Sequence, residues 1–401
     1  MSDRVKLLMP THNFPRFEGD FAGVFISLLA KNLPAFGIDP VILAPHDPGA
    51  AEYEEIDGVT IYRFRYADTD AEENIAYRGN MHQLVLGSPG GIFRFKHFLD
   101  CFRNAALDVI DREQINVVGG HWLVPTGIVM KTIAKKTSLP MVMSSHGTDV
   151  RLMRKYAGVI YRYLKGFCRG LHRWTVVSNF LRDAILEADP MLQSILEVLP
   201  LPHDETVFFR DETIVRGSDL IVAVTRFTEQ KRVDYLIKAF AHVNESHPQA
   251  RLELYGTGPL ENDIRSLIDR FGLTQRIRIH EPIPQKQLCE IYNRAAMVVL
   301  NSHQEGFGLA LSEAMMCGAA VIGTNSGGIS DIISEGKTGL LVPVDDSAAL
   351  AEAMKLLLDD DAMRSSMADA GHKFAHNTYS SGPLAKRYSE IIKAAAGRKL
   401  Y

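Results

Sequence analysis

The sequence has no apolar run that approaches the roughly 20 residues needed to span a bilayer. Its first residues, MSDRVKLLMP, lead directly into an expected strand, without an apolar leader and a cleavage site. Low-complexity tracts and short repeats are also missing. We therefore expect a cytoplasmic protein that stays on the side of the membrane where it is made.

The sequence also has few cysteines and a small net charge. The four cysteines are far apart and form no CxxC pair, so neither a disulfide framework nor a zinc site is indicated. A formal net charge of -4 gives no reason to expect nucleic acid as a partner. A length of 401 residues is too great for one core, so two domains of similar size are expected.

The most informative stretch is NSHQEGFGLALSEAMMCGAAVIGTNSGGISD, residues 301–331. The apolar runs AAMVVL before it and AAVIG within it are typical of buried strands in a parallel sheet. Between them, Leu309, Leu311, Ala314 and Met315 are apolar at helical spacing, and Gly318 follows where a helix C-terminal glycine is favoured. This pattern predicts a strand-loop-helix-strand unit whose loop is EGFG.

The EGFG loop carries residues suited to a phosphate and a sugar. Gly306 and Gly308 would let the backbone approach a ligand, and free amides at a helix start favour an anion such as a diphosphate. Glu305 and Glu313 are about two helical turns apart, which places both carboxylates on one side. A carboxylate can accept two sugar hydroxyls at once. The alternative is that Glu305 only caps the helix and Glu313 is solvated.

Two cations follow another expected strand, LIVAVT. Arg226 comes directly after it, and Lys231 lies five positions further on, before an amphipathic helix. An arginine and a lysine at a strand's carboxyl end suit a diphosphate leaving group, although an ordinary surface pair would look the same. The later G-x-G of LELYGTGPLE is weak support for a nicotinamide or flavin cofactor, because Glu261 stands where a third glycine belongs.

In the N-terminal half, a strand at 5–10, a polar loop, a helix at 21–33 and a second strand form a beta-alpha-beta unit. Residues 115–122, which include His121, are expected to form a strand that runs into a ligand-facing loop. Residues 141–149 repeat the pattern, with His146 at the carboxyl end of the strand. In open parallel sheets, ligands bind at the carboxyl ends of the strands. A lone histidine is more often a packed or capping residue, and we favour that interpretation for His121.

The segment from Arg151 to Trp174 contains seven Lys or Arg residues, no acid and several aromatic residues. A solvated basic helix and a surface that binds an anionic membrane both fit this composition. The proline-rich stretch 196–209 is the expected interdomain linker.

Taken together, the motifs resemble the retaining glycosyltransferases of family 4. The sequences EGFG, SEAM, CGAAVI, GGISD and GKTGLLVP match the donor-binding half of that family, densely over 220–345 and loosely elsewhere. The resemblance implies an α/β GT-B fold, in which two Rossmann-like doubly wound domains face a central cleft. Residues 1–200 would bind the acceptor and 205–382 the donor, with a C-terminal helix, 383–401, packing back on the first domain.

The resemblance also implies a reaction and its residues. A sugar would move with retention from a nucleotide diphosphate sugar, UDP- or GDP-linked, to a hydroxyl acceptor in polysaccharide, glycolipid or other glycoconjugate synthesis. Arg226 and Lys231 would bind the diphosphate, and Glu313 the ribose. The implied catalytic residues are His146, Glu305, Arg226 and Lys231, and the implied donor-binding residues are Gly19, Gly306, Phe307, Gly308, Leu309 and Glu313.

Gly19 and Asp20 stand where the family has paired glycines, and Asp20 would repel donor phosphates. Nothing resembles the DxD aspartates that hold a metal in the other major transferase fold, so we expect neither a metal nor a cofactor. The acceptor could be a sugar, a lipid-linked sugar or a small molecule, reached at an anionic membrane surface through 151–174. The alternatives are another GT-B reaction, such as nucleotide-sugar epimerisation, or an inactive sugar-nucleotide-binding partner.

Overall fold

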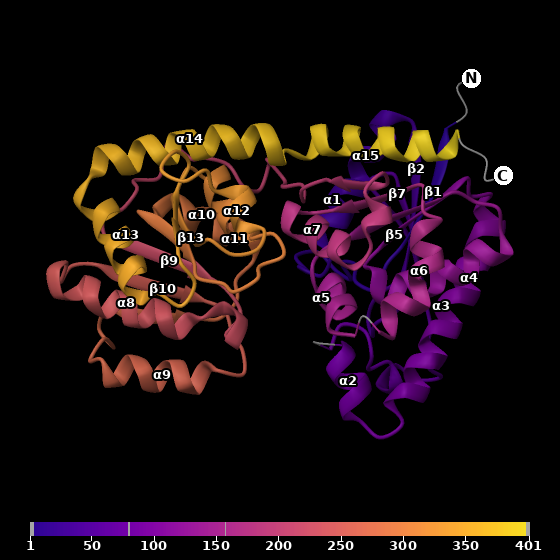
Figure 1. Ribbon diagram of the computed structural model, residues 1–401, viewed down its shortest axis with the longest axis horizontal. Helices are drawn as coiled ribbons and strands as arrows, with labels where there is room; N and C mark the ends of the chain where they lie inside the picture. The colour runs from indigo at the N-terminus through magenta and orange to yellow at the C-terminus, as the bar shows by residue number, and fades with distance from the viewer. Residues whose placement is uncertain (1–3, 79–80, 157, 398–401) are drawn as a thin grey trace. The chain divides into compact units, whose positions relative to one another are not determined.

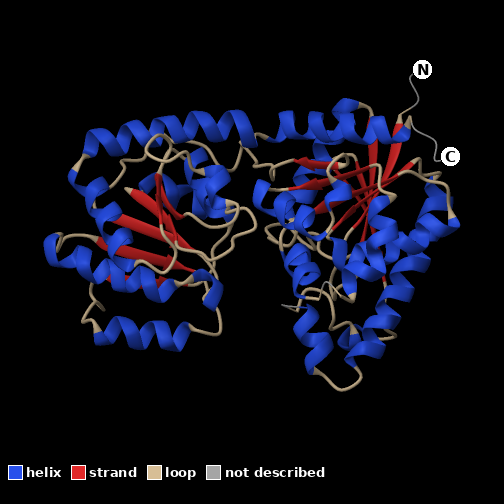
Figure 2. Ribbon diagram, in the orientation of Figure 1, coloured by secondary structure: helices blue, strands red, loops and turns tan. Residues whose placement is uncertain are grey.

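The computed structural model describes residues 4–78, 81–156 and 158–397, and the chain divides into two compact units. The first unit contains the chain up to Pro202 and the C-terminal segment from Ser381, and the second runs from His203 to Ser380. In each unit a sheet lies between helices (Figure 1, Figure 2). The class is therefore α/β, as the sequence predicts.

The first unit has an eight-stranded sheet in the order β3-β4-β2-β1-β5-β6-β7-β8. All neighbouring strands are parallel except β3 and β4. The central strands are apolar and buried on both faces, as parallel strands covered by helices must be. The strands are β1 (Val5–Pro10), β2 (Ile38–Pro45), β3 (Tyr53–Ile56), β4 (Val59–Phe64), β5 (Val117–His121), β6 (Met141–Ser145), β7 (Arg173–Val176) and β8 (Leu196–Val198).

Helices α1 (Val24–Asn32) and α15 (Ser381–Ala396) pack together over β1 and β5 of this sheet. Tyr388 and Ile392 of α15 are completely buried in one core cluster with Leu7 of β1. The C-terminal helix is thus part of the first unit's core. The other helices of the unit are α2 (Met81–Gly87), α3 (Gly91–Glu113), α4 (Ile128–Lys136), α5 (Thr148–Lys155), α6 (Ile160–Arg169) and α7 (Asn179–Ala188).

The second unit has a six-stranded, fully parallel sheet in the order β11-β10-β9-β12-β13-β14. Its strands are β9 (Leu220–Val224), β10 (Arg251–Tyr255), β11 (Ile277–His280), β12 (Met297–Leu300), β13 (Ala320–Thr324) and β14 (Leu340–Val342). Its helices are α8 (Val233–Ser246), α9 (Glu261–Arg270), α10 (Gln285–Arg294), α11 (Leu309–Met316), α12 (Ile329–Ile332), α13 (Ser347–Asp359) and α14 (Asp361–Tyr379).

In both sheets the strand order reverses near the centre. The chain leaves β1 toward one edge and later returns to β5 beside it; in the second unit it leaves β9 and returns to β12. Loops that follow two such strands diverge to opposite faces and leave a crevice at the carboxyl ends, which is where open α/β sheets bind ligands. Each unit therefore has one topologically favoured binding position.

Candidate functional site

The favoured position of the second unit holds an ion pair between Lys231 and Glu305. Lys231 follows β9 and Glu305 follows β12, so the adjacency of these strands brings the two side chains together. Their side chains are 14% and 15% exposed. Ser302 Oγ donates to Oε2 of Glu305 at 2.9 Å, and the Gly306 N–H donates to Oε1 at 3.2 Å. The carboxylate is therefore held in one orientation.

Hydrogen bonds to backbone carbonyl groups join the two loops that carry this pair. The His303 N–H donates to the carbonyl oxygen of Gln230 at 2.7 Å. Asn301 Nδ2 donates to the carbonyl oxygen of Arg232 at 2.9 Å. Lys231 is thus fixed from its backbone as well as from its side chain.

Arg226 lies two residues after β9 and is exposed. Among the residues that the structure describes, none forms an ion pair or side-chain hydrogen bond with its guanidinium group. Close packing shapes the loop around it, because a Cβ at Gly258 would lie 2.4 Å from the Phe227 carbonyl oxygen. The G-x-G of this segment therefore has a packing function next to a cation that is available to a ligand.

The charge on Glu305 is set by opposing effects. Burial alone would raise the pKa of this carboxyl, but the charge of Lys231 and the hydrogen bonds from Lys231, Ser302 and Gly306 lower it below its usual value. Glu305 is consequently ionised at neutral pH. It acts as an acceptor of hydrogen bonds and not as a proton donor.

Helix α11 starts at Leu309, four positions after Glu305. Gly308 precedes it with a φ of +114°, a conformation that favours glycine. The first N–H groups of a helix have no partner within the helix, and its dipole favours an anion there. Leu309, the first residue of α11, is 36% exposed, whereas Leu311, Ala314 and Met315 are buried.

The GG pair of GGISD lets a second loop pack against EGFG. A Cβ at Gly327 would lie 2.2 Å from the carbonyl oxygen of Glu305, and one at Gly328 would lie 2.5 Å from that of Gly306. The Gly328 N–H also donates to the Glu305 carbonyl oxygen at 2.8 Å. Larger residues here would displace the loop that carries the carboxylate.

Glu313 lies in a different environment from Glu305. It is only 9% exposed, so the alternative of a solvated helix residue is wrong. Tyr292 of α10 donates from its hydroxyl to Oε2 of Glu313 at 3.2 Å. Burial raises the pKa of Glu313 to about 8. This carboxyl would gain from hydroxyl donors that favour its ionised form.

In the first unit, His146 follows β6 and meets residues from the neighbouring strands. Its Nε2 lies 3.0 Å from Nδ1 of His121, which ends β5. The Trp122 ring lies 4.7 Å from the His146 ring and 4.6 Å from that of His12, which follows β1. Sequence reasoning passed over His12 and treated His121 as a packed residue. The position of both histidines at the end of central strands was the available signal.

Gly19 lies in the loop after β1, is exposed and has a φ of +86°. The prediction that the charge of Asp20 would repel donor phosphates was wrong, because that charge is paired. Arg16 Nε lies 2.7 Å from Oδ2 of Asp20, and Asp20 is 4% exposed. Its charge is therefore compensated within the loop.

Comparison with known proteins covers both units. The profile of "Glycosyl transferases group 1" matches residues 204–374, and that of "Glycosyltransferase Family 4" matches 22–207. The chain belongs to glycosyltransferase family 4. Two adjoining family profiles thus account for nearly the whole described chain.

Relatives and solved structures agree with this membership. The N-acetyl-alpha-D-glucosaminyl L-malate synthase of Bacillus anthracis is 25% identical over 75% of this chain and 80% of its own. A D-inositol 3-phosphate glycosyltransferase of Corynebacterium efficiens is 32% identical, over 44% of this chain and 43% of its own. The sucrose-phosphate synthase of Thermosynechococcus elongatus has a TM-score of 0.78 at 18% identity and covers 97% of this chain and 98% of its own. The fold is therefore GT-B.

The basic segment of this family 4 glycosyltransferase forms α5, α6 and the start of β7, apart from residue 157, which lies outside the described residues. Val159 and Tyr163 are 74% and 53% exposed. Lys131 of α4 lies 3.4 Å from the centre of the Tyr163 ring. Arg154 pairs with Glu187 at 3.3 Å. No helix in the described part of the chain is long and apolar enough to cross a membrane.

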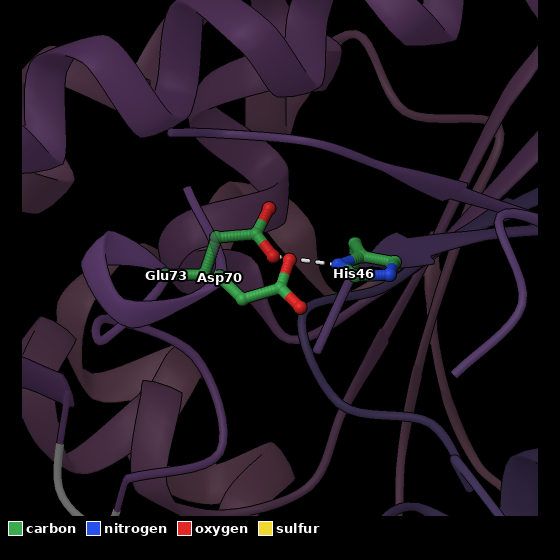
Figure 3. A group of neighbouring side chains, drawn as sticks. All are labelled: His46, Asp70 and Glu73. Atoms are coloured by element: carbon green, nitrogen blue, oxygen red, sulfur yellow. Dashed lines mark hydrogen bonds and ion pairs between the residues drawn. The ribbon is translucent and has the colours of Figure 1, made fainter. Parts of the chain in front are cut away.

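A separate group of titratable side chains lies in the first unit, formed by His46, Asp70 and Glu73 (Figure 3). His46 Nδ1 lies 2.5 Å from Oε2 of Glu73, and its Nε2 lies 3.0 Å from the carbonyl oxygen of Ala50. Arg65 lies 3.1 Å from Glu73 and 2.8 Å from Asp70. An arginine already compensates both carboxylates, and both histidine nitrogens are in use. We therefore interpret this group as an ion-pair cluster of the fold.

Proposed function

We propose that this family 4 glycosyltransferase moves a sugar with retention from a UDP- or GDP-sugar to a hydroxyl acceptor, without a metal ion. One observation carries the proposal: a lysine fixed by a carboxylate at the strand-order reversal, next to a helix N-terminus. The exposed Arg226 lies after the same strand as Lys231. This combination suits a diphosphate attached to a sugar.

The cations and amides would stabilise the departing diphosphate. Negative charge develops on this group as the glycosidic bond breaks, and donors fixed in advance stabilise it with little reorganisation. Glu305 and the loop hydrogen bonds hold Lys231 in place before a ligand arrives. Arg226 and the amides from Gly306 to Leu309 would complete the site. Protein cations would then replace the divalent ion that many transferases use.

Glu305 would bind the donor sugar through the lone pairs that its own contacts leave open. Lys231 and Ser302 donate to Oε2, whereas the Gly306 N–H is the only donor to Oε1 among the described residues. A carboxylate oxygen accepts two hydrogen bonds, so Oε1 retains one position for a sugar hydroxyl. Its pairing with Lys231 makes Glu305 a poor free nucleophile. Retention would then proceed on one face, with the leaving phosphate taking the acceptor proton.

Glu313 would accept the ribose hydroxyls. It is buried in α11 and receives only the Tyr292 hydroxyl among the side-chain donors of the described residues. Two ribose hydroxyls would supply the donors that its ionised form needs. Nucleotide binding would therefore release a proton from this carboxyl near neutral pH.

The first unit would bind the acceptor, with His146 contacting the donor sugar. The names of two relatives point to unlike acceptors, L-malate and D-inositol 3-phosphate. We favour a lipid-linked or polysaccharide acceptor for this chain, because basic residues and the exposed Val159 and Tyr163 share the segment that follows His146. This would make the enzyme peripheral on an anionic membrane.

A thermal-shift panel of UDP, GDP, ADP and their sugars, with and without excess EDTA, tests the donor assignment. A ligand that binds only the folded state raises the melting temperature, and the rise grows as the ligand concentration exceeds its Kd. We expect UDP or GDP to stabilise the protein equally in EDTA. Stabilisation by no nucleotide, or only with added magnesium or manganese, would show that the diphosphate site is misassigned.

A donor that binds is then incubated without acceptor and afterwards with candidate acceptors. Slow release of free sugar identifies an active transferase and excludes an inactive sugar-nucleotide-binding partner. The anomeric configuration of the product, read by NMR coupling constants, tests retention. An inverted product would refute the one-face reaction while leaving the nucleotide site in place.

A further inference from the structure

The strand-order reversal of the first unit is lined by three histidines that the proposed chemistry uses only in part. His12, His121 and His146 follow or end β1, β5 and β6, three neighbouring strands. The Trp122 ring packs against His12 and His146, and the Phe25 ring lies 4.7 Å from His146. Aromatic rings thus enclose a group of imidazoles at the topologically favoured position.

The imidazoles leave buried nitrogens without partners. Nδ1 of His12, Nε2 of His121 and Nδ1 of His146 are all inaccessible to water, and none has a hydrogen-bond partner among the described residues. A buried polar atom that makes no hydrogen bond costs about 1–3 kcal/mol, so each such atom calls for an explanation. Three of them at one sheet edge indicate that the group serves something other than stability.

All three histidines are neutral at pH 7. Burial lowers the pKa of His12 to about 4 and that of His121 to about 3. Burial, then the neighbouring His121 and His12, lower the pKa of His146 well below its usual value. This group therefore suits an uncharged hydroxyl and gives no charge attraction to a phosphate or carboxylate.

The hydrogen bond between His121 and His146 couples their tautomers. If His121 donates from Nδ1, His146 accepts at Nε2 and must carry its proton on Nδ1. If His146 donates from Nε2 instead, its Nδ1 becomes an acceptor. One proton between the rings thus decides whether the other edge of His146 donates or accepts a hydrogen bond.

The surrounding backbone holds this pair in place. Asp149 is 1% exposed and accepts from the Leu123 N–H at 2.7 Å and from the His146 N–H at 3.2 Å. It therefore ties the loop after β5 to the loop after β6. Trp122, which follows β5, has a φ of +62°, a conformation that costs a non-glycine residue about 1–3 kcal/mol. Strain of this kind persists only where neighbouring contacts impose it.

We propose that His121 is a positioning residue for sugar transfer, whose hydrogen bond fixes the tautomer and ring orientation of His146 toward a sugar hydroxyl. The inference rests on the proposed function for the identity of the ligand. The ring pair itself does not depend on it. His146 is partly exposed, although its buried Nδ1 must be uncovered before a sugar hydroxyl can reach it. His121 is 1% exposed and acts only through its neighbour.

Two substitutions separate positioning from packing. His121→Phe keeps a ring but removes the hydrogen bond, and should lower kcat about tenfold, the equivalent of one neutral hydrogen bond. His121→Asn places an amide near the position of Nδ1 and should restore most of this loss. The affinity for free nucleotide should stay unchanged in both variants, because the proposed nucleotide contacts lie in the second unit.

His172→Phe is the matched control. Nδ1 of His172 accepts from the Met141 N–H at 3.3 Å, at the opposite end of β6 from His146. His172→Phe removes a hydrogen bond between a histidine and the same strand, and kcat should not change. A kcat equal to wild type in His121→Phe, or an equal loss in His121→Asn and His121→Phe, would overturn the positioning role.

Nitrogen-15 NMR of the imidazoles tests the pair without measuring turnover. Thermal unfolding first shows that each variant is folded. The His146 signals, assigned with His146→Asn, should show one tautomer in the wild type and a mixture in His121→Phe. An unchanged tautomer in His121→Phe would refute the proposal. If no sugar donor binds or reacts but the His146 tautomer changes in His121→Phe, the proposed function fails. The coupling between His121 and His146 is then still supported.

Discussion

The ammonium group of Lys231 is bonded to the carboxylate of Glu305, which lies 74 residues further along the chain. Lys231 ends a short 3-10 helix, Glu229–Lys231, and Glu305 lies in a loop. Each orients the other, and the pair joins the loops after two adjacent strands. A ligand at this edge therefore meets a cation whose position is already determined.

Lys231→Ala should lower turnover about a hundredfold or more, because it removes charge stabilisation of the leaving group. It should also destabilise the fold by up to about 3 kcal/mol, since a mostly buried carboxylate loses its partner. The double variant Lys231→Met with Glu305→Gln should regain the stability but not the activity. Steady-state kinetics and urea unfolding measure both effects. Near-normal turnover in Lys231→Ala would refute the diphosphate assignment.

Arg226→Ala should lower turnover to a similar extent while leaving stability within about 0.5 kcal/mol, because this exposed side chain makes no ion pair with a described residue. Arg278→Ala is the control, since Arg278 is also exposed but lies on β11 at the edge of the same sheet. The control should behave as the wild type. Equal losses in the two variants would mean that a general charge effect, and not a site, is measured.

Glu313→Gln should change the pH dependence of stability. The pKa of Glu313 rises from 4.5 to about 8 on folding, so between these values the folded state holds a proton that the unfolded state has released. Wild-type stability therefore falls as the pH rises through this range, by at most about 1.4 kcal/mol per pH unit. The variant should exceed the wild type most at pH 8 and least at pH 4.5, measured by urea unfolding. A constant difference would contradict the raised pKa.

The same variant should bind free nucleotide more weakly than the wild type, with a smaller effect on turnover at saturation. Ribose contacts are made equally in the ground state and the transition state, so they contribute to affinity and little to the chemical step. Isothermal titration calorimetry gives the affinity. Unchanged affinity would remove Glu313 from the ribose site.

Arg162→Glu with Lys165→Glu should abolish binding to anionic vesicles at low salt. Both residues are exposed on α6, near the exposed Tyr163, and each cation at an anionic surface contributes roughly 1 kcal/mol. Arg278→Glu with Lys286→Glu makes the same charge change on exposed positions of the second unit and should leave binding unchanged. Co-sedimentation with and without high salt measures this. A wild type that never sediments would favour a soluble acceptor.

Strongly periodic elements were predictable from the sequence, and isolated or edge elements were not. β1 coincides with the strand predicted at 5–10, and α11 starts at Leu309, the first apolar residue of the predicted helical pattern. Edge strand β3 was missed because Tyr53 and Ile56 are about half exposed, so no buried alternation marks it. Helix α1 starts at Val24, three residues after the start predicted at residue 21. Gly23 caps it at a φ of +63°, and Phe21 is 81% exposed.

The residues of the candidate site could be proposed from the sequence, but their contacts could not. Motif residues such as Glu305, Lys231 and His146 stand out by type and position. Which of them meet depends on strand order, and the sequence of a single chain does not state that β12 lies beside β9 or β6 beside β5. The pairing of His121 with His146, and of Arg16 with Asp20, follows from that order and from loop conformation.

The place of α15 in the first unit affects the order in which the protein can fold. Ala385, Tyr388 and Ile392 are fully buried against strands made hundreds of residues earlier. During synthesis this face of the first unit's sheet lacks the cover of α15 until residues 381–396 have been made. The second unit is continuous in sequence and can complete its core before then. A nascent chain stalled or truncated after Tyr379 would therefore carry a finished second unit and an unfinished first one.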